Sequence, residues 1–527
     1  MEISPPAQNN PYLDEIYRVL PRLLALYDRD NTSPTYGVGD RLYWAWKVKD
    51  FANGTFQGAA HGLARLLHHD LLPDYVSERA VLERIDAMFR GAQYISYPNG
   101  SAVEAFPYEN SFCVTALVAY DLLTAIEILA SALPEKNRTR YLRIVRPMIQ
   151  FVERSEETHA FISNHLATAA AALYKWNHLT AESGRSRADV LLERILDEQS
   201  EDGWYREYEG ADPGYQSLAT DYLADIHAMT RYKRFEDSLA RSLQFLWYFA
   251  HPDGSFGGHY GSRNTRFYFP AGIKYLAGEI PEATVLAEYM EHSITRHSVV
   301  TLDTLDESNL IPMFNSYCRA AALWRVRTAE SSGEDPVLPA LQREYHRKRF
   351  DEAGLLIDNT PRAYTIVSWQ KGGVCYHFSK ENGTRIIDTG VVGKSPAGEL
   401  FSSQTSQPEN SLRVGDKVIT VEAALTTLHK EYPAPLKFLL LRVLNLTVMR
   451  IRWIREFIKR RLVKRLITGR KVLSIRNKRT ITLGEHLHIN DEWIPANCNL
   501  ERVEVPQPFS AIHMASQGYW QRQDDSR

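Results

Sequence analysis

The sequence predicts an α+β protein: an N-terminal (α/α) toroid of about six helical hairpins followed by an antiparallel β-sandwich domain. A turn dipeptide that precedes a new apolar helix recurs about every 50 residues, as at Asn53-Gly54 and Asn99-Gly100. After about residue 350 the helical pattern gives way to alternating apolar and polar residues. A fixed period of this size is typical of repeat architectures, and the change of period marks a second domain. We therefore assign the toroid to 1–345 and the β-sandwich to 350–527.

Six repeat units account for the helical region. Asp202-Gly203 and Asp253-Gly254 continue the series of turns, and degenerate turns at Glu157-Thr158 and Asp306-Glu307 complete it. Between the turns, apolar residues recur at spacings of three and four, as in Leu239, Leu243, Leu246 and Trp247. Each unit is therefore expected to hold an outer helix, a turn and an inner helix. Six such pairs fit a closed ring better than the alternative, an open solenoid.

The second domain should consist of short strands separated by turns. Turns are indicated at Lys371-Gly-Gly, Glu381-Asn-Gly and Val414-Gly-Asp, because glycine and asparagine tolerate the backbone conformations of tight turns. The segments expected as strands are 355–358, 363–369, 374–378, 385–388, 417–422 and 471–489, with Trp493 beyond them. Such a series favours a mostly antiparallel sandwich.

Composition limits the classes of protein to consider. The chain has 527 residues, of which 44% are hydrophobic, and a formal net charge of −2, so it is long enough for two domains with large cores. Its four cysteines, Cys113, Cys318, Cys375 and Cys498, show no CxxC spacing, so neither a disulfide framework nor a zinc knuckle is indicated. No secretory signal and no apolar run long enough to span a membrane is visible. These features favour a reduced, cytoplasmic location.

Two stretches one repeat apart contain the first candidate catalytic residues. Ser163-Asn164-His165-Leu166 opens an alanine-rich helix, and Gly210-Ala-Asp-Pro-Gly-Tyr215 opens the next inner helix. In a toroid, Asn164 and Tyr215 would face one cavity. An amide that binds an acid substrate, with the imidazole of His165 beside it and a phenol across from it, could remove and return a proton next to a carboxylate. We therefore expect chemistry on uronic acid sugars.

A glycine-rich loop in the fifth unit supplies a second candidate cluster. His259, Tyr260, Arg263, Asn264 and Arg266 lie within one short segment. Its glycines would let the loop approach a ligand closely, and its arginines could bind carboxylate or sulfate groups through two parallel hydrogen bonds. Further candidates for substrate binding are Trp204, Glu109 and Asn110.

Each of these residues also has a structural interpretation. Asn164 could cap the helix that it opens, a position that favours asparagine. Tyr215 and Trp204 could be core aromatics of the toroid, since large aromatics at helix ends often fill such cores. His259 and Arg263 could belong to a polar network within the loop.

The pairing of Asn164-His165 with Tyr215 on consecutive toroid units, followed by a β-domain, resembles the heparinase II/III-like polysaccharide lyases over about residues 40–500. The resemblance implies that Asn164 neutralises the uronate carboxylate, that Tyr215 transfers the proton and that His165 assists. The family's β-domain usually contributes a histidine from a Gly-His-x-His-x-Asp-like segment, sometimes with a metal. The comparable stretch here keeps only His377, so we expect no metal and no cofactor, and His259 could take the place of the missing histidine.

The segment 436–471 is the sharpest anomaly of composition. It holds twelve Lys or Arg against the single acid Glu456, and its apolar residues recur every three or four positions from Leu440 to Leu466. This pattern predicts one basic amphipathic helix inserted in the β-sandwich domain. Such a helix can lie in a bilayer interface, through Arg452, Arg455, Lys459, Arg460 and Lys464. The alternative is an insert that packs its apolar stripe on the sandwich.

Two classes of function remain open from the sequence. The first is an enzyme that acts on an acidic, uronate-containing polysaccharide by abstracting the C5 proton and eliminating the 4-linked sugar. The same site would be a C5-epimerase if the proton returned on the other face, or a glycoside hydrolase if a carboxylate pair such as Asp212 and Asp221 cleaved the bond. The second is a noncatalytic glycan-binding protein of surface-polysaccharide assembly at the inner face of the membrane. Nucleic acid is not an expected partner, because no aromatic-interleaved basic surface is present.

Overall fold

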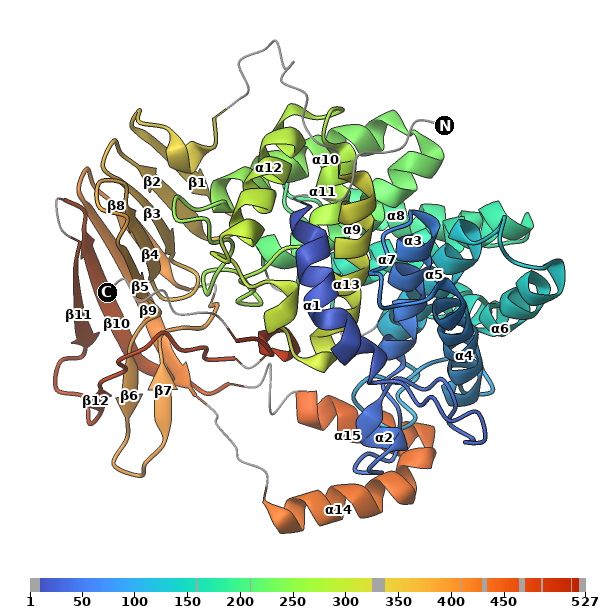
Figure 1. Cartoon of the computed structure of the whole chain (residues 1–527). Coiled ribbons are helices and arrows are strands. Elements are labelled where there is room, and N and C mark those ends of the chain that lie inside the picture. The colour runs from blue at the N-terminus through green and yellow to red at the C-terminus, as the bar shows by residue number, and fades with distance from the viewer. Residues whose placement is uncertain are drawn as a thin grey trace.

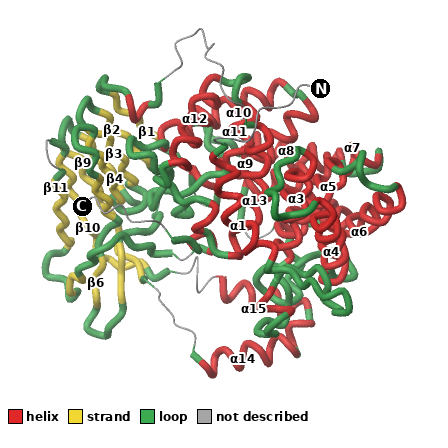
Figure 2. Tube along the Cα trace, in the orientation of Figure 1, coloured by secondary structure: helices red, strands yellow, loops and turns green. Residues whose placement is uncertain are grey.

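The computed structural model describes residues 10–157, 160–208, 210–324, 337–407, 409–428, 434–463, 470–484, 487–512 and 514–520. Helices and strands are segregated along the chain: helices before residue 324 form one half of the molecule, and the strands from 346 onward form the other (Figures 1 and 2). Two further helices, α14 (Pro435–Leu446) and α15 (Arg452–Val463), lie beside the helical half although they come between strands in the sequence (Figure 1).

Six inner helices form a closed ring. They are α3 (Ala59–His68), α5 (Phe112–Ile128), α7 (Ser163–Thr180), α9 (Pro213–Thr230), α11 (Pro270–Leu276) and α13 (Glu307–Leu323). Each contacts the next one, and α13 contacts α3. The outer helices are α1 (Pro11–Leu24), α4 (Glu78–Ile95), α6 (Glu135–Arg154), α8 (Arg185–Asp197), α10 (Lys233–Leu246) and α12 (Pro281–Thr295), and a short helix α2 (Arg41–Trp44) lies between α1 and α3. The predicted toroid of six helical hairpins is confirmed, and its ring is closed.

The sequences of the helices explain why some are inner and some outer. Along α5 nearly every residue is apolar or small and is buried, whereas α8 buries a single stripe that includes Leu191 and Ile195. A helix that is apolar on all sides has to be surrounded by protein, and one with a single apolar stripe lies at the surface. Asp212 and Asp306 fix the starts of α9 and α13, because each side chain accepts a backbone N–H of its own helix.

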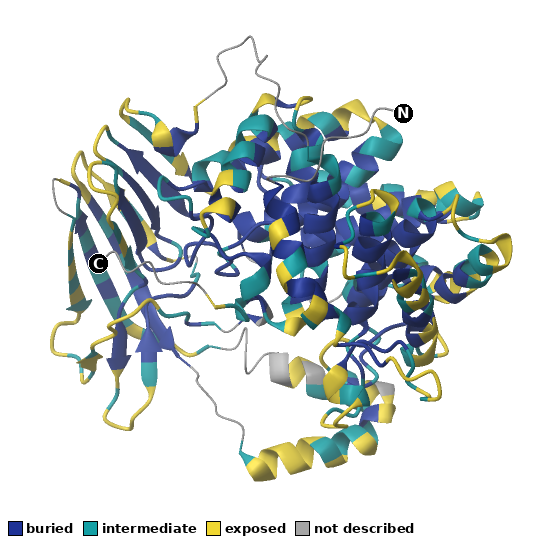
Figure 3. Cartoon of the chain, in the orientation of Figure 1, coloured by how far each residue is buried: buried dark blue, intermediate teal, exposed yellow. Residues whose placement is uncertain are grey.

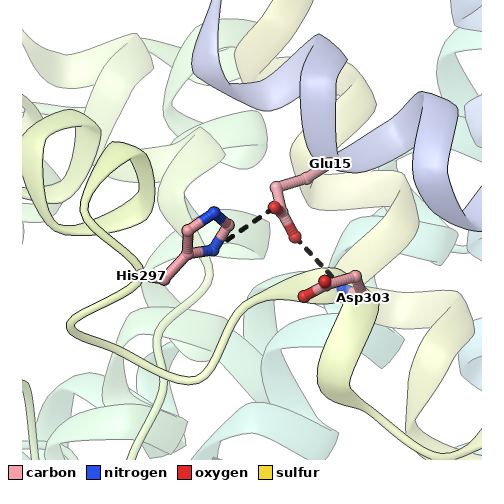
Figure 4. A group of neighbouring side chains, drawn as sticks. All are labelled: Glu15, His297 and Asp303. Carbon is pink, nitrogen blue, oxygen red and sulfur yellow. Dashed lines mark hydrogen bonds and ion pairs between the residues drawn. The ribbon is translucent and has the colours of Figure 1, made fainter. Parts of the chain in front are cut away.

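The ring closes where α1 meets the loop between α12 and α13. One carboxylate oxygen of Glu15 lies 3.7 Å from His297 Nδ1, and the other accepts the backbone N–H of Asp303 at 3.2 Å (Figure 4). Among the residues that the structure describes, these three are the one group with the spacing of metal ligands. Arg18 already supplies a cation there, 3.0 Å from Glu15. We interpret the group as an ion-pair network that holds α1 on the ring.

The strands form two antiparallel sheets. The first has the order β1-β2-β3-β4-β5 and consists of β1 (His346–Phe350), β2 (Leu355–Asn359), β3 (Ala363–Ser368), β4 (Val374–Ser379) and β5 (Arg385–Asp388). The second has the order β11-β10-β9-β7-β6-β12, with β8 paired to β9. Its strands are β6 (Val392–Lys394), β7 (Leu400–Ser402), β8 (Ser411–Val414), β9 (Val418–Thr427), β10 (Val472–Thr482), β11 (His488–Ile494) and β12 (Glu501–Val503).

The first sheet is buried on both faces. Along β2, Leu356 packs with Val421 and Ile481 of the second sheet, whereas Leu355 and Ile357 belong to the core of the toroid. This alternation is the period of two that strand geometry imposes. The predicted sandwich is therefore confirmed, and the molecule has three layers: toroid, first sheet and second sheet (Figure 3). Loops of the toroid meet turns of the first sheet where these layers join.

The segment 436–471 does not form the single helix that its pattern predicts. Thr447 ends α14 with φ −116° and ψ −92°, and a tight turn at 448–450 leads into α15. Met449 in this turn is fully buried. Because Met449 packs into the protein, the apolar stripe expected to run from Leu440 to Leu466 is broken at the turn.

The described helices include none that is both long enough and apolar enough to cross a bilayer.

Candidate active site

Asn164 lies in the first turn of α7, where its side chain binds a buried glutamate. Its Nδ2 donates to both carboxylate oxygens of Glu207, at 2.9 and 2.8 Å, and its backbone N–H donates to one of them at 3.0 Å. The N-cap of α7 is Ile162, so Asn164 is not the cap that its position in the sequence suggested. The Asn164 amide therefore already binds a carboxylate of the protein.

Glu207 is a site residue that the sequence did not reveal. Its side chain is fully buried, and Arg263 Nη1 lies 3.6 Å from it. Burial raises the pKa of the Glu207 carboxyl, while Arg263, Asn164 and His165 act in the opposite direction. The carboxylate therefore holds together the first turn of α7, the strand-like segment before α9 and the loop before α11.

His165 lies next to this group but points to a different partner. Its Nδ1 is 2.7 Å from Glu157 Oε2. Burial lowers the pKa of His165, but Cys113 and Glu157 outweigh burial and raise it well above the usual value. The contact with Glu157 thus favours the protonated imidazole, whose charge in turn lowers the pKa of Glu207.

The Arg263 guanidinium lies close to two tyrosine rings, those of Tyr215 and Tyr208. The guanidinium carbon is 3.4 Å from the ring centroid of Tyr215 and 5.2 Å from that of Tyr208. Burial raises the pKa of the Tyr215 phenol, and Arg263 opposes that rise. The Nε and Nη1 groups of Arg263 have no hydrogen-bond acceptor among the described residues. Arg263 therefore organises two phenols through its charge and its flat faces.

The glycine-rich loop brings His259 to the first sheet. The backbone N–H of His259 donates to the Tyr376 hydroxyl at 3.1 Å, and that hydroxyl lies 2.6 Å from Nδ1. Burial lowers the pKa of His259 to about 3, with help from Arg266 and Lys371. The ring is therefore neutral, and because Nδ1 accepts the tyrosine proton, we assign the remaining N–H to Nε2. A Cβ at Gly258 would lie 2.7 Å from the Tyr376 ring, which explains the glycine there.

Lys371, in the turn between β3 and β4, reaches the same loop. Its Nζ donates to the Gly261 carbonyl at 2.8 Å and to the side-chain oxygen of Asn264. The side chain is nearly buried, and burial lowers its pKa to about 7. Among the described residues, no carboxylate forms an ion pair with this amine. Asp212 is the opposite charge that acts on it, but both oxygens of Asp212 already accept backbone N–H groups.

A cavity of about 550 Å³ lies between the toroid loops and the two sheets. Its wall includes Tyr208, Tyr260 and Ser262 from the toroid, Lys371 from the first sheet, and Arg470 and Met514 from the C-terminal part of the chain. The Tyr260 hydroxyl bonds to His251 Nε2 at 2.7 Å, which fixes that ring in place. A cavity of this size fits a small ligand or part of a polymer, and two basic side chains make it favourable for an anion.

Tyr208 was also not singled out by the sequence. It has a φ of 60°, in the left-handed region that bulky residues rarely adopt. Such a conformation persists only where the surroundings hold it, and it often marks a functional site. The strained residue Tyr208 lies in the cavity wall. No pattern in the sequence indicates its position or its backbone conformation.

Several predicted substrate-binding residues do not reach this cavity. Trp204 is buried in the core of the toroid, so its ring packs on protein and is not open to a sugar. One Glu109 carboxylate oxygen accepts the backbone N–H groups of residues 104, 105 and 106, and the Asn110 side chain accepts from Ser101 Oγ at 2.7 Å. Glu109 and Asn110 thus shape a loop. Arg266 is not in the cavity wall either; it acts on the phenols of the buried Tyr376 and the partly buried Tyr519.

The carboxylate pair considered for hydrolysis is not a facing pair. Asp212 caps α9, and Asp221 is nine positions further along the helix, where it binds Arg319 at 2.8 Å. That spacing corresponds to roughly 13 Å along the helix axis, beyond the separation at which two carboxylates flank a glycosidic bond. These two residues do not form a hydrolase site.

His377, the remaining histidine of the β-domain segment, points away from the toroid. Its Nδ1 lies 2.9 Å from Thr365 Oγ1. On β4 it is adjacent to Tyr376, which contacts the toroid loop, so the two side chains lie on opposite faces of the sheet. The β-domain therefore contributes Lys371 and Tyr376 to the joint with the toroid, and not His377.

No protein-family model and no curated protein matches the chain. Solved structures do match. A chondroitin AC lyase of Streptomyces coelicolor has a TM-score of 0.47 and 12% identity, with 81% of this chain and 67% of that chain covered. A Paenibacillus xanthan lyase has a TM-score of 0.46 and 11% identity, with 80% and 46% covered. The cellobiose 2-epimerase of Bacillus thermoamylovorans has a TM-score of 0.43 and 11% identity, with 59% and 99% covered.

The resemblance to toroid polysaccharide lyases that the sequence indicated thus recurs among solved structures. A heparinase III and family 76 glycoside hydrolases are also among the matches. With identities of 10–14% and TM-scores below 0.5, the feature in common is the toroid architecture. The activity of this chain therefore has to be inferred from its own residues.

Proposed function

We propose that the chain is an enzyme that acts on an acidic polysaccharide and binds a uronate carboxylate of its substrate in the cavity against Lys371. The observation that carries this proposal is a nearly buried lysine amine in a cavity wall with no carboxylate partner among the described residues. A substrate carboxylate would supply the missing counter-charge. Arg470 in the same wall adds a second cation.

The proposed reaction starts with proton abstraction at C5 of the uronate. Removing this proton places negative charge on the carboxylate oxygens, and a cation in a site that excludes water stabilises that charge more than the charge of the substrate. The C5–H electron pair then forms the C4–C5 double bond. The C4–O bond breaks with its electrons on the leaving oxygen, which takes up a proton. If the C5 carbanion were instead protonated on its other face, the same site would be an epimerase.

Two phenols lie in the cavity wall, Tyr208 and Tyr260. Tyr208 is the better placed to move these protons, because the Tyr260 hydroxyl already bonds to His251. The Arg263 guanidinium lies 5.2 Å from the centre of the Tyr208 ring. Arg263 is in turn positioned by Glu207, which accepts a hydrogen bond from Asn164. In this proposal Asn164 is a positioning residue, and Lys371 takes the neutralising role that the resemblance gives to Asn164. The roles predicted for Asn164, His165, Tyr215 and His259 stay predictions, and Tyr215 is the alternative proton-transfer group.

A second candidate function is glycan binding without turnover. It is favoured by polar groups that already have partners: the Asn164 amide binds Glu207, and Nδ1 of His259 accepts from Tyr376. In this case the cavity would hold an acidic sugar but would not remove its proton.

The test is incubation of the purified protein with a panel of uronate polysaccharides of different sugars and linkages, with their carboxyl-reduced forms as matched controls. Elimination is followed by the ultraviolet absorbance of the unsaturated uronate, and epimerisation by solvent deuterium incorporated at C5. We expect product or deuterium with at least one acidic polymer and none with the reduced forms. Binding by calorimetry without either signal would establish the second candidate, and no binding to any acidic polymer would overturn both.

A further inference from the structure

The helices α14 and α15 expose more large apolar side chains than any other part of the described chain (Figure 3). Leu436 is 80% exposed, Leu440 60% and Trp453 72%. Their neighbours Phe438, Leu439, Val443, Leu446, Ile451 and Phe457 are also exposed. Soluble proteins rarely present a continuous apolar surface of this kind unless something binds it.

Packing against the described part of the chain does not explain the composition of α14. Eight of its twelve residues are Leu, Val or Phe, and none of its residues is buried. A helix at the surface of a soluble protein has one apolar face, and a helix that is apolar on most sides is normally surrounded. The structure therefore shows an apolar helix without its apolar surroundings.

This segment is strongly basic. Residues 434–463 include eight Lys or Arg and the single acid Glu456. Lys437, Arg460 and Arg461 are exposed. A surface that combines exposed leucines and an exposed tryptophan with basic side chains is complementary to the interface of an anionic bilayer, where lipid headgroups supply the negative charge and the acyl boundary accepts the apolar groups.

Other basic side chains attach the segment to the toroid. Arg442 forms an ion pair with Asp50 at 3.0 Å, and Arg450 donates to the Tyr108 hydroxyl at 3.2 Å. Arg455, which the sequence predicts as a membrane-binding residue, is buried and donates to the Met449 carbonyl at 3.1 Å. That prediction is wrong for Arg455, because its guanidinium stabilises the turn between the helices. Lys464 and the side chains of Arg452 and Lys459 lie outside the described residues.

The exposed apolar surface continues onto the toroid. Arg442 also donates to the Lys47 carbonyl at 3.3 Å, and the residues on either side, Trp46 and Val48, are exposed. Tryptophan is enriched where proteins meet the headgroup level of membranes. The attachment of α14 thus brings a second exposed tryptophan next to the basic helices.

We propose that α14, α15 and the loop around Trp46 dock on the surface of an anionic lipid bilayer. With twelve residues, α14 is about 18 Å long, shorter than the roughly 30 Å hydrocarbon core, so it lies along the interface and does not span it. Arg470 of the cavity wall follows seven residues after the end of α15. A docked protein therefore holds the cavity within about 25 Å of the helices on the membrane.

The experiment is vesicle co-sedimentation of the full chain with phosphatidylglycerol-rich and with pure phosphatidylcholine vesicles. We expect sedimentation with the anionic vesicles that is at least tenfold stronger than with the neutral ones and that weakens as salt rises. The triple variant Leu436→Ser, Leu440→Ser, Trp453→Ser should lose at least tenfold in binding. A matched control changes Val337, Leu341 and Tyr345 to Ser, since these residues are similarly exposed but lie in the segment just before β1; it should bind as the unchanged protein does.

A second variant separates charge from apolar contact. Lys437→Gln, Arg460→Gln, Arg461→Gln removes exposed cations but leaves Arg442, Arg450 and Arg455 to hold the segment. We expect this variant to lose the preference for anionic vesicles while circular dichroism and the melting temperature stay unchanged.

The competing occupant of this surface is a second copy of the chain. Light scattering without vesicles decides between the two: the proposal predicts a monomer that binds anionic vesicles. A dimer that the apolar triple variant converts to a monomer, with no vesicle binding by either protein, would overturn it. Equal sedimentation of the unchanged protein and both variants would do the same.

Discussion

Two buried cations stand on the two sides of the joint between toroid and sandwich, and they differ in how their charge is balanced. Arg263 belongs to the toroid, has Glu207 at 3.6 Å and lies close to two tyrosine rings. Lys371 belongs to the first sheet, and among the described residues its amine bonds to a carbonyl and an amide oxygen. The first cation has a carboxylate beside it, and the second has none within the described part of the chain.

This difference indicates that Arg263 is part of the framework of the toroid and that Lys371 is a ligand-binding group. Arg263, Glu207 and Asn164 tie together three toroid segments, so a ligand anion would have to compete with a carboxylate that is already in place. Lys371 gains a counter-charge only when an anion enters the cavity. Burial without a partner also explains why its pKa is lowered to about 7.

The largest effect should come from Lys371→Met. Methionine has a similar length and no charge, so the fold and the melting temperature should be kept or improved, because a buried cation costs free energy. Turnover of the acidic polymer should fall by roughly 100-fold or more, the usual scale for a lost electrostatic contact to the transition state. Steady-state kinetics and thermal melting measure the two quantities.

The control for this variant is Lys380→Met. Lys380 also donates to a carbonyl and an amide oxygen, and burial lowers its pKa to about 8, but it is not in the cavity wall. The Lys380→Met variant should turn over the substrate at the rate of the unchanged protein. Equal losses of turnover in both variants would mean that the two lysines affect turnover by stabilising the fold. The difference between Lys371 and Arg263 would then have no role in catalysis.

The next largest effect should separate the two phenols around Arg263. Tyr208→Phe should lower turnover by about 100-fold, as for loss of a proton-transfer group, with little change in substrate binding. Tyr215→Phe should lower it by less than tenfold, because Tyr215 is not in the cavity wall. The reverse order would restore the assignment that the sequence suggested and would place the reacting sugar on the toroid side of Arg263.

A smaller effect on turnover, but a clear effect on stability, is expected for Asn164→Ala. The variant leaves the buried Glu207 carboxylate without two hydrogen bonds, so the free energy of unfolding should fall by about 2–3 kcal/mol. Turnover of the folded protein at low temperature should change by less than tenfold. Denaturant unfolding and kinetics on the same sample measure both, and a large loss of turnover at unchanged stability would show that Asn164 binds the substrate directly.

The toroid could be predicted because its signals are local and repeated. Turn dipeptides such as Asp253-Gly254 and the apolar spacing of Leu239, Leu243 and Leu246 recur in each unit. The strands β2 to β5 were also predicted, because short apolar runs there are separated by glycine-containing turns. The strand β1 and the short strands β6, β7, β8 and β12 were missed, since β1 is rich in charge and the others are too short to show a period.

The site was predicted only in part because its geometry depends on distant contacts. The sequence drew attention to the stretches around Asn164, Tyr215 and Arg263, and the structure brings these stretches together. Nothing local shows that Glu207 is buried, that Tyr208 has a positive φ, or that the turn at Lys371 reaches a loop more than a hundred residues earlier in the chain. The basic segment was predicted as one helix because the burial of Met449 has no signature in its apolar spacing.

The most direct test of the account is calorimetric titration of a uronate oligosaccharide, with its carboxyl-reduced form as control, in buffers of different ionisation enthalpy. With a pKa of about 7, Lys371 is mostly protonated below pH 7 and mostly neutral above it. An anion that binds it restores the proton, so at pH 8 binding should take up close to one proton, and affinity should fall by about tenfold per pH unit above 7. Lys371→Met should abolish the proton uptake and most of the affinity. Tight binding of the acidic oligosaccharide without proton uptake, with the same affinity in Lys371→Met, would contradict the claim that this lysine binds the substrate carboxylate.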